Sequence, residues 1–155
     1  MIEKLQNCWI TKLYLSVTRF SNKYLFDLLV LFMRLWMAQI FWYSGLTKIA
    51  NWKSTIYLFK YEYAVPLIDA EIAAMLATAT ELSTPILLIL GIATRFAAIP
   101  MLIMTAVIQF TYLSLIDHLY WASFLGTIIL YGAGKYSIDR IICRYYCCPR
   151  SPEKP

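Results

Sequence analysis

Four long apolar segments limit most strongly how this chain can fold. They run from about Tyr24 to Leu46, Ile72 to Leu90, Phe96 to Ile116 and Leu119 to Ala133. Each reaches, or nearly reaches, the ~20 residues that an α-helix needs to cross ~30 Å of hydrocarbon. Lipid offers no hydrogen-bond partners to an open sheet edge, so helices are the expected form of these segments. The sequence predicts an all-α, polytopic membrane protein with a four-helix transmembrane bundle.

The composition supports this class. Of the 155 residues, 61% are hydrophobic and 15% are charged, whereas soluble domains are nearer half apolar and a quarter charged. These values exclude a disordered chain and an ordinary soluble enzyme. The net charge of +5 comes from cations that flank the apolar segments. Such charges set membrane orientation, so the expected partner is the lipid bilayer and not nucleic acid.

Three regions are predicted from these patterns. Residues 1–23 carry apolar side chains at helical spacing with Lys4, Lys12 and Arg19 between them, which predicts a basic amphipathic helix on the cytoplasmic membrane surface; a frayed polar tail is the alternative. Residues 24–134 form the transmembrane domain. Within it, residues 51–70 are too polar to span and rich in aromatic rings, so they are predicted to be an interfacial segment between the first two spans. Residues 135–155 are predicted to be a basic, cysteine-containing cytoplasmic tail.

The distribution of Lys and Arg predicts the orientation. Both tails and Arg95 carry most of these residues, and only Lys48, Lys53 and Lys60 fall on the opposite side. Cytoplasmic loops carry the excess of positive charge. We therefore expect a multi-pass membrane protein with both termini in the cytoplasm.

Four cysteines, Cys8, Cys143, Cys147 and Cys148, lie near the termini. A thiolate metal site is one interpretation, because residues four apart share a helix face. The chain has no C-x-x-C pair, and its one histidine, His118, is far away in sequence. Reduced structural thiols are the favoured interpretation, and no metal site is predicted.

Two charges fall deep inside the predicted spans. Arg34 lies roughly 15 Å from the start of the first span, and Glu81 lies about 14 Å from the start of the second, at 1.5 Å per residue. Each would cost roughly 2.5–3.5 kcal/mol or more if it faced lipid alone. The two side chains are therefore predicted to face inward and pair. Such a pair either fixes helix register without chemistry or serves a ligand or a proton, and the sequence leaves both open.

Neighbouring positions support an inward face at both charges. Asp27, Arg34, Phe41 and Lys48 repeat every seven residues and share one helix stripe. Small residues surround Glu81, which suits close helix packing. Gln109 is predicted in the outer half of the membrane, near a mouth shared with Lys48, Ser44 and His118. The plainer alternatives are a helix-to-helix hydrogen bond for Gln109 and an ordinary interface histidine for His118.

The order and spacing of several short motifs resemble those of the DoxX family of small bacterial membrane proteins. The similarity extends from Arg34 to Asp139 and covers about two-thirds of the chain. After Arg34, the motifs are Ser44-Gly45-Leu46-Thr47-Lys48-Ile49, Tyr61-Glu62-Tyr63, Val65-Pro66, Glu81-Leu82, Pro85, Gly91, Thr94-Arg95-Phe96-Ala97-Ala98 and Gly132-Ala133-Gly134-Lys135-Tyr136-Ser137-Ile138-Asp139.

The resemblance implies a four-helix inner-membrane protein linked to redox biology, in quinol-oxidising or thiol-oxidant-handling complexes. The first hypothesis is an accessory subunit of such a complex, in which the Arg34–Glu81 centre binds a quinone headgroup or relays a proton. The alternatives are a non-catalytic membrane scaffold or anchor, and a small carrier of lipids or ions. Independent catalysis is not expected. A homo-oligomer or a membrane redox partner is the expected assembly.

Overall fold

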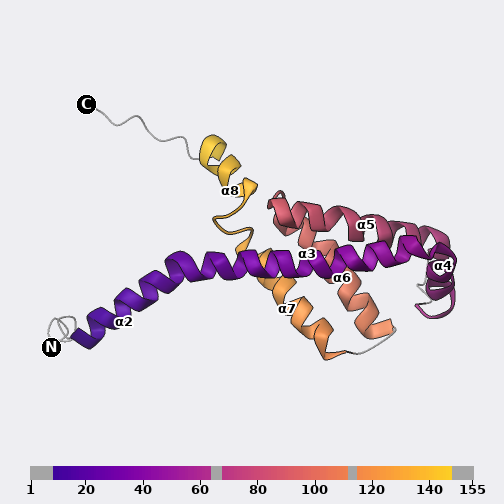
Figure 1. Cartoon of the computed structure of the whole chain (residues 1–155), viewed down its shortest axis with the longest axis horizontal. Coiled ribbons are helices and arrows are strands. Elements are labelled where there is room, and N and C mark those ends of the chain that lie inside the picture. The colour runs from indigo at the N-terminus through magenta and orange to yellow at the C-terminus, as the bar shows by residue number, and fades with distance from the viewer. Residues whose placement is uncertain (1–8, 64–67, 112–114, 148–155) are drawn as a thin grey trace.

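The computed structural model describes residues 9–63, 68–111 and 115–147, and these residues form helices and connecting turns without a strand. Helix α2 (Trp9–Phe20) continues through a π-helical turn (Ser21–Leu25) into α3 (Phe26–Ala50). The remaining elements are α4 (Trp52–Tyr61), α5 (Ala70–Leu90), α6 (Thr94–Thr111), α7 (Ile116–Tyr131), α8 (Ile138–Ile142) and a second π-helical turn (Cys143–Cys147). The all-α prediction is confirmed (Figure 1).

Within the described ranges, three helices are long and apolar enough to cross a membrane: α3, α5 and α6. Helix α7 has 16 residues, or roughly 24 Å at 1.5 Å per residue, so a fourth span stays a prediction. The predicted end of the third span at Ile116 was wrong. Helix α6 ends at Thr111, and Leu115 is extended before α7 begins at Ile116.

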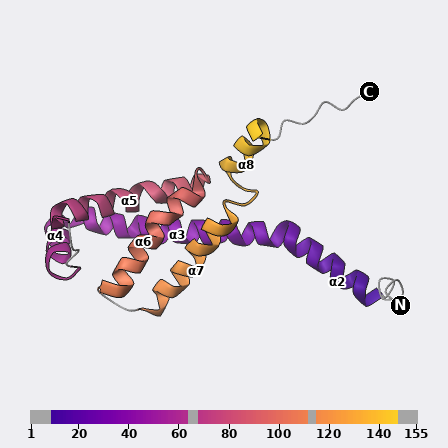
Figure 2. The same ribbon diagram turned by 180° about the vertical axis from the view of Figure 1, so that it is seen from behind.

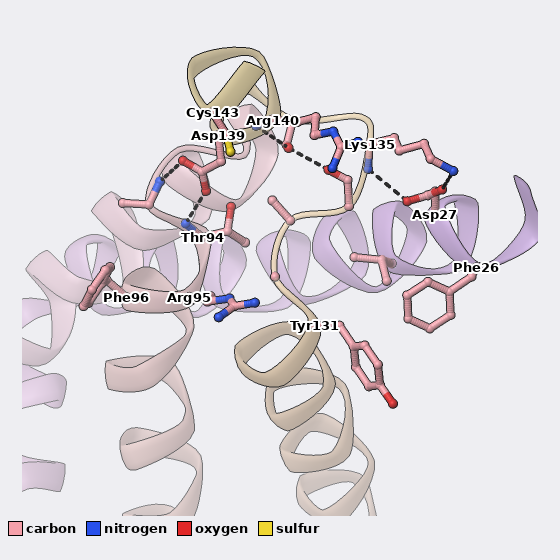
Figure 3. Close-up of a pocket in the computed structure, with 16 residues that line it drawn as sticks. Phe26, Asp27, Thr94, Arg95, Phe96, Tyr131, Lys135, Asp139, Arg140 and Cys143 are labelled. Carbon is pink, nitrogen blue, oxygen red and sulfur yellow. Dashed lines mark hydrogen bonds and ion pairs between the residues drawn. The ribbon is translucent and has the colours of Figure 1, made fainter. Parts of the chain in front are cut away.

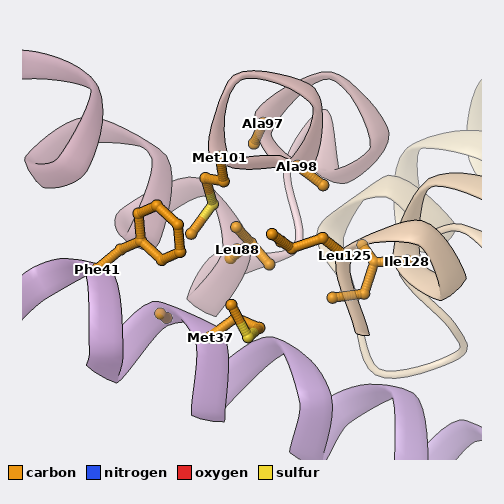
Figure 4. Close-up of a cluster of buried hydrophobic side chains, with 9 residues drawn as sticks. Met37, Phe41, Leu88, Ala97, Ala98, Met101, Leu125 and Ile128 are labelled. Atoms are coloured by element: carbon orange, nitrogen blue, oxygen red, sulfur yellow. The ribbon is translucent and has the colours of Figure 1, made fainter. Parts of the chain in front are cut away.

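Two pairs of helices pack closely together. Helices α3 and α5 lie side by side, and α6 and α7 form a second pair that crosses α3, as both views show (Figures 1 and 2). Their shared core contains small and flexible side chains (Figure 4). In lipid, such residues favour association because backbones approach closely and van der Waals packing replaces the hydrophobic effect. The core residues are Met37, Ala38, Phe41, Leu88, Ala97, Ala98, Met101, Leu125 and Ile128.

Helix ends follow their local sequence. The Asn51 side chain accepts a hydrogen bond from Ser54 N and caps α4, and Asp69 caps α5 in the same way. Gly91 ends α5 at φ 70°, a left-handed conformation that favours glycine. This glycine also allows the close approach of Arg34 and Ser137, because a Cβ there would lie 2.5 Å from Arg34 Nη2 and 2.6 Å from Ser137 Cβ.

The regions on either side of the first span differ in packing. Helix α2 projects away from the bundle (Figures 1 and 2), and its Trp9, Leu13 and Val17 are exposed. Helix α4 packs against α5, where Phe59 meets Ala73 and Ala74. Both segments are helical, but their placement at a membrane surface stays a prediction.

Candidate functional site

The inward stripe predicted on the first span is present in α3. Asp27, Arg34 and Phe41 are buried and Lys48 is half-buried. Glu81 faces the same interior from α5, with 2% of its surface exposed, and Arg34 is 1% exposed. These two charges are therefore shielded from the outside of the bundle, as the cost of facing lipid requires.

Backbone carbonyl groups bind the Arg34 guanidinium. Its Nε donates to Leu88 O at 2.8 Å, and its Nη2 donates to Ile89 O at 3.1 Å. Its Nη1 donates to Ala133 O at 2.7 Å and to Tyr136 O at 2.8 Å. The last turn of a helix leaves carbonyl groups without intrahelical partners. Arg34 therefore satisfies carbonyls at the end of α5 and in the segment that follows α7, and ties these segments to α3.

The predicted Arg34–Glu81 pair was wrong. Arg34 contacts α5 at residues 88 and 89, about seven residues beyond Glu81, which is roughly 10 Å along the helix. The predicted depth of Arg34 was wrong, because Arg34 lies near one end of the bundle and not at its middle. Gly45, eleven residues further along α3, is the position that faces Glu81 and Leu82.

Lys48 is the cation that pairs with Glu81. Its Nζ lies 2.7 Å from Oε1 and 2.8 Å from Oε2 of the carboxylate. Ser44 bridges the two side chains, because its hydroxyl donates to Glu81 Oε1 at 3.2 Å and accepts from Lys48 Nζ at 2.9 Å. Ser44 and Lys48 are four residues apart and so share one face of α3. The three residues form the Lys48–Glu81–Ser44 site.

A small cavity of about 100 Å³ adjoins this site. Lys48 and Glu81 supply its charged wall, and α4 with the residues after it supplies Phe59 and Tyr63. A concave, mostly apolar space with a few convergent polar groups is the usual form of a small-molecule site. The other lining residues are apolar and come from α5 and α6: Ala77, Ile103, Met104, Val107 and Ile108.

Gln109 and His118 form a separate hydrogen-bonded group. His118 Nδ1 lies 2.8 Å from Gln109 Oε1, which also accepts from Leu115 N at 3.1 Å. These bonds join the end of α6 to the start of α7. The predicted proximity of Gln109 and His118 is present. Neither residue lines the cavity beside Lys48 and Glu81, and a mouth shared with Ser44 and Lys48 stays a prediction.

Three further contacts join the C-terminal segment to the bundle (Figure 3). Lys135 Nζ pairs with Asp27 Oδ2 at 2.6 Å. The Asp139 carboxylate accepts from Ala93 N at 2.8 Å and from Thr94 N at 3.1 Å, at the start of α6. Sequence reasoning missed these partners. The motif ending in Ser137-Ile138-Asp139 could have indicated the Asp139 contact, because serine and aspartate favour positions beside free backbone N–H groups at helix starts.

No group of three or more potential metal ligands occurs among the residues that the structure describes. Cys143 is exposed and unbonded. The alternative thiolate site cannot be placed, because Cys8, Cys148 and the Cys147 side chain lie outside the described part of the chain.

Comparison with known proteins gives one family and one relative. The family model described as DoxX matches residues 29–113, from α3 to beyond α6. An uncharacterized protein of Haemophilus influenzae is 32% identical over 129 residues, covering 76% of this chain and 85% of the relative. No solved structure matches the chain significantly.

Proposed function

Because the chain belongs to the DoxX family and contains apolar helices of membrane-spanning length, we propose that it is an accessory subunit of a redox-linked membrane complex. In this role, the Lys48–Glu81–Ser44 site binds the polar headgroup of a lipid-soluble molecule, with a quinone as the candidate, or holds a proton beside it. The redox link comes from the family resemblance. The site comes from the geometry of the three side chains.

One observation supports this function above the others: a buried carboxylate–ammonium pair forms one wall of an apolar cavity. The Lys48 ammonium and Ser44 hydroxyl are donors suited to a carbonyl oxygen, and Glu81 is an acceptor suited to a hydroxyl. At about 100 Å³, the space suits a small polar ring group, while an isoprenoid tail would extend into lipid. A partner must supply the electrons, since one histidine provides no bis-histidine haem ligation.

Quinone binding by the protein purified in mild detergent tests this function. We expect a short-chain ubiquinone to bind saturably to the wild type and roughly tenfold more weakly to Glu81→Gln and Lys48→Met, because a hydrogen bond to a charged group contributes about 1.5–3 kcal/mol. Lys53→Met on the exposed face of α4 is the matched control. Equal binding by all four proteins would reject the site.

A membrane anchor or scaffold is the second candidate, supported by α2. This helix projects beyond the bundle with Trp9, Leu13 and Val17 exposed, as expected of a segment that meets lipid or a partner. Deleting residues 1–20 would separate the two functions. A scaffold would lose its complex while the quinone affinity of the bundle stayed unchanged.

The proposed setting is the bacterial inner membrane, with α7 as a short fourth span and both termini in the cytoplasm. The excess of Lys and Arg at the α5–α6 end and in the two tails supports this orientation. In spheroplasts, tags at both termini should resist external protease until the membrane is opened. Cleavage of either tag in intact spheroplasts would contradict the proposed topology.

A further inference from the structure

A second cleft, of about 520 Å³, lies at the opposite end of α3 from the Lys48–Glu81–Ser44 site (Figure 3). The start of α3, the start of α6 and the end of α7 surround it, and the segment after α7 closes one side. The ends of membrane-spanning helices lie near the lipid headgroups. A cleft at this level is therefore within reach of a phospholipid headgroup.

Most charged groups of this cleft already have partners. Asp27 pairs with Lys135, and both oxygens of the Asp139 carboxylate accept backbone N–H groups. The side chains of Arg95 and Arg140 differ, because neither makes an ion pair or hydrogen bond with any described residue. The Arg95 guanidinium extends between the start of α6 and the end of α7 (Figure 3). Its Nε would lie only 3.1 Å from a Cβ at Gly132, so a glycine there leaves room for this side chain.

The residue before Arg95, Thr94, carries an unsatisfied hydroxyl group. Thr94 is fully buried and lines the cleft, and its Oγ1 is the one buried side-chain oxygen or nitrogen in the described residues that lacks a hydrogen-bond partner. Buried polar groups are normally satisfied, and no described protein group occupies this hydroxyl, so it is available as a donor. Arg95 and Thr94 both line the cleft, and a cation and a hydroxyl donor on one cleft suit an acceptor with several oxygens.

Aromatic rings complete the surroundings. The rings of Phe26 and Tyr131 meet edge to face, with 5.1 Å between their centroids. Both rings line the cleft together with Phe96. Phe96 and Tyr131 are largely exposed, as expected of rings at the boundary between hydrocarbon and headgroups. A soluble anion would not require an apolar rim, whereas a lipid carries acyl chains next to its phosphate.

We propose that this cleft binds the phosphate group of an anionic phospholipid, with Arg95 as the main cation and the Thr94 hydroxyl as a second donor. Arginine forms paired, charge-assisted hydrogen bonds with phosphate oxygens, and basic pockets between transmembrane helices bind anionic headgroups. The bound lipid joins the starts of α3 and α6 to the end of α7. This site is independent of the quinone site at the other end of α3.

Lipid retention in nanodiscs tests the proposal. The protein is reconstituted in phosphatidylcholine with a small fraction of phosphatidylglycerol, released, and analysed by native mass spectrometry. We expect wild type to retain phosphatidylglycerol selectively, Arg95→Gln to bind it about tenfold more weakly, and Thr94→Val to show a smaller loss. Lys53→Gln, which removes an exposed cation from α4, is the charge-matched control and should behave as wild type.

The source of the phosphate is tested in the same samples. Added inorganic phosphate should compete weakly, because it lacks the acyl chains that the aromatic rim would contact. Stabilisation by inorganic phosphate alone, without preference for phosphatidylglycerol, would overturn the assignment to a lipid. Equal retention by Arg95→Gln and Lys53→Gln would overturn the site. Since Arg95 is exposed and unpaired, its substitution should leave the fold intact, and an unchanged melting temperature without lipid checks this.

Discussion

The two ends of α3 stabilise buried charge in different ways. At one end, Arg34 donates to four backbone carbonyls from α5 and from the segment after α7. At the other, Lys48 and Glu81 neutralise each other beside a cavity. Carbonyl groups at a helix terminus are fixed parts of the fold, whereas side chains beside an empty space can accept a ligand. The comparison assigns a structural role to Arg34 and leaves the Lys48–Glu81–Ser44 site able to bind a ligand.

Replacing Arg34 should have the largest effect on stability. Arg34→Leu leaves four carbonyls without their donor, and we expect a loss of about 3–5 kcal/mol in the free energy of unfolding. The measurement is unfolding in mixed micelles of mild detergent and dodecyl sulfate. Lys12→Leu on the projecting α2 is the control and should change stability by less than about 0.5 kcal/mol. A loss of less than about 1 kcal/mol in the free energy of unfolding for Arg34→Leu would contradict the structural role assigned to Arg34.

Removing Glu81 should cost less than removing Arg34. Glu81→Leu leaves Lys48 without its counter-ion, and because the Lys48 side chain remains 14% exposed, part of the penalty is relieved by snorkelling. We expect a loss of about 2–3 kcal/mol. The double variant Lys48→Met/Glu81→Leu should recover much of this stability, since an apolar pair often replaces a buried ion pair without loss. No recovery would argue against a simple charge pair.

Gly91→Ala tests the structural end without changing a charge. Alanine at φ 70° is strained by about 1–2 kcal/mol, and its Cβ would crowd Arg34 Nη2 and Ser137. We expect a melting temperature several degrees lower with unchanged ligand binding at the Lys48–Glu81–Ser44 site. Gly126→Ala, where an added Cβ meets nothing within 4 Å, is the matched control. Comparable melting temperatures for the two variants would contradict the interpretation that the fold requires glycine at position 91.

Asp139→Ala should have the smallest effect. It removes the acceptor for Ala93 N and Thr94 N at the start of α6, a contact comparable to a helix cap and worth about 1 kcal/mol. Hydrogen exchange should increase at those two amides and leave the α4 amides unchanged. Increased exchange at both ends of the bundle would mean that the two ends are not independent.

Hydropathy and spacing predicted much of this arrangement. The long apolar segments gave three helices of membrane-spanning length, and the seven-residue repeat from Asp27 to Lys48 correctly predicted an inward face. The burial of Arg34 and Glu81 also followed from the cost of exposing charge to lipid. Each of these properties depends on local pattern, which a single sequence contains.

The partners of the buried charges could not be predicted in the same way. The depth of a residue depends on where along the helix the bundle begins. Helix α3 continues without a break into the projecting α2, so the start of the apolar segment does not mark the start of the bundle. Pairing opposite side-chain charges does not identify the partners of Arg34, because they are backbone carbonyls, two of them at the end of α5. Asp139 contacts the start of α6 at positions 45 and 46 residues away in the sequence. A hydropathy pattern does not predict contacts between residues so far apart.

A pair of double-mutant cycles tests the division between the two ends most directly. Stability is measured for Lys48→Met, Arg34→Gln and Glu81→Leu alone and for the two double variants that include Glu81→Leu. We expect a coupling energy of about 1–3 kcal/mol between Lys48 and Glu81, and less than about 0.5 kcal/mol between Arg34 and Glu81, because distant sites without shared partners are additive. Strong coupling of Glu81 to Arg34, with none to Lys48, would contradict the account.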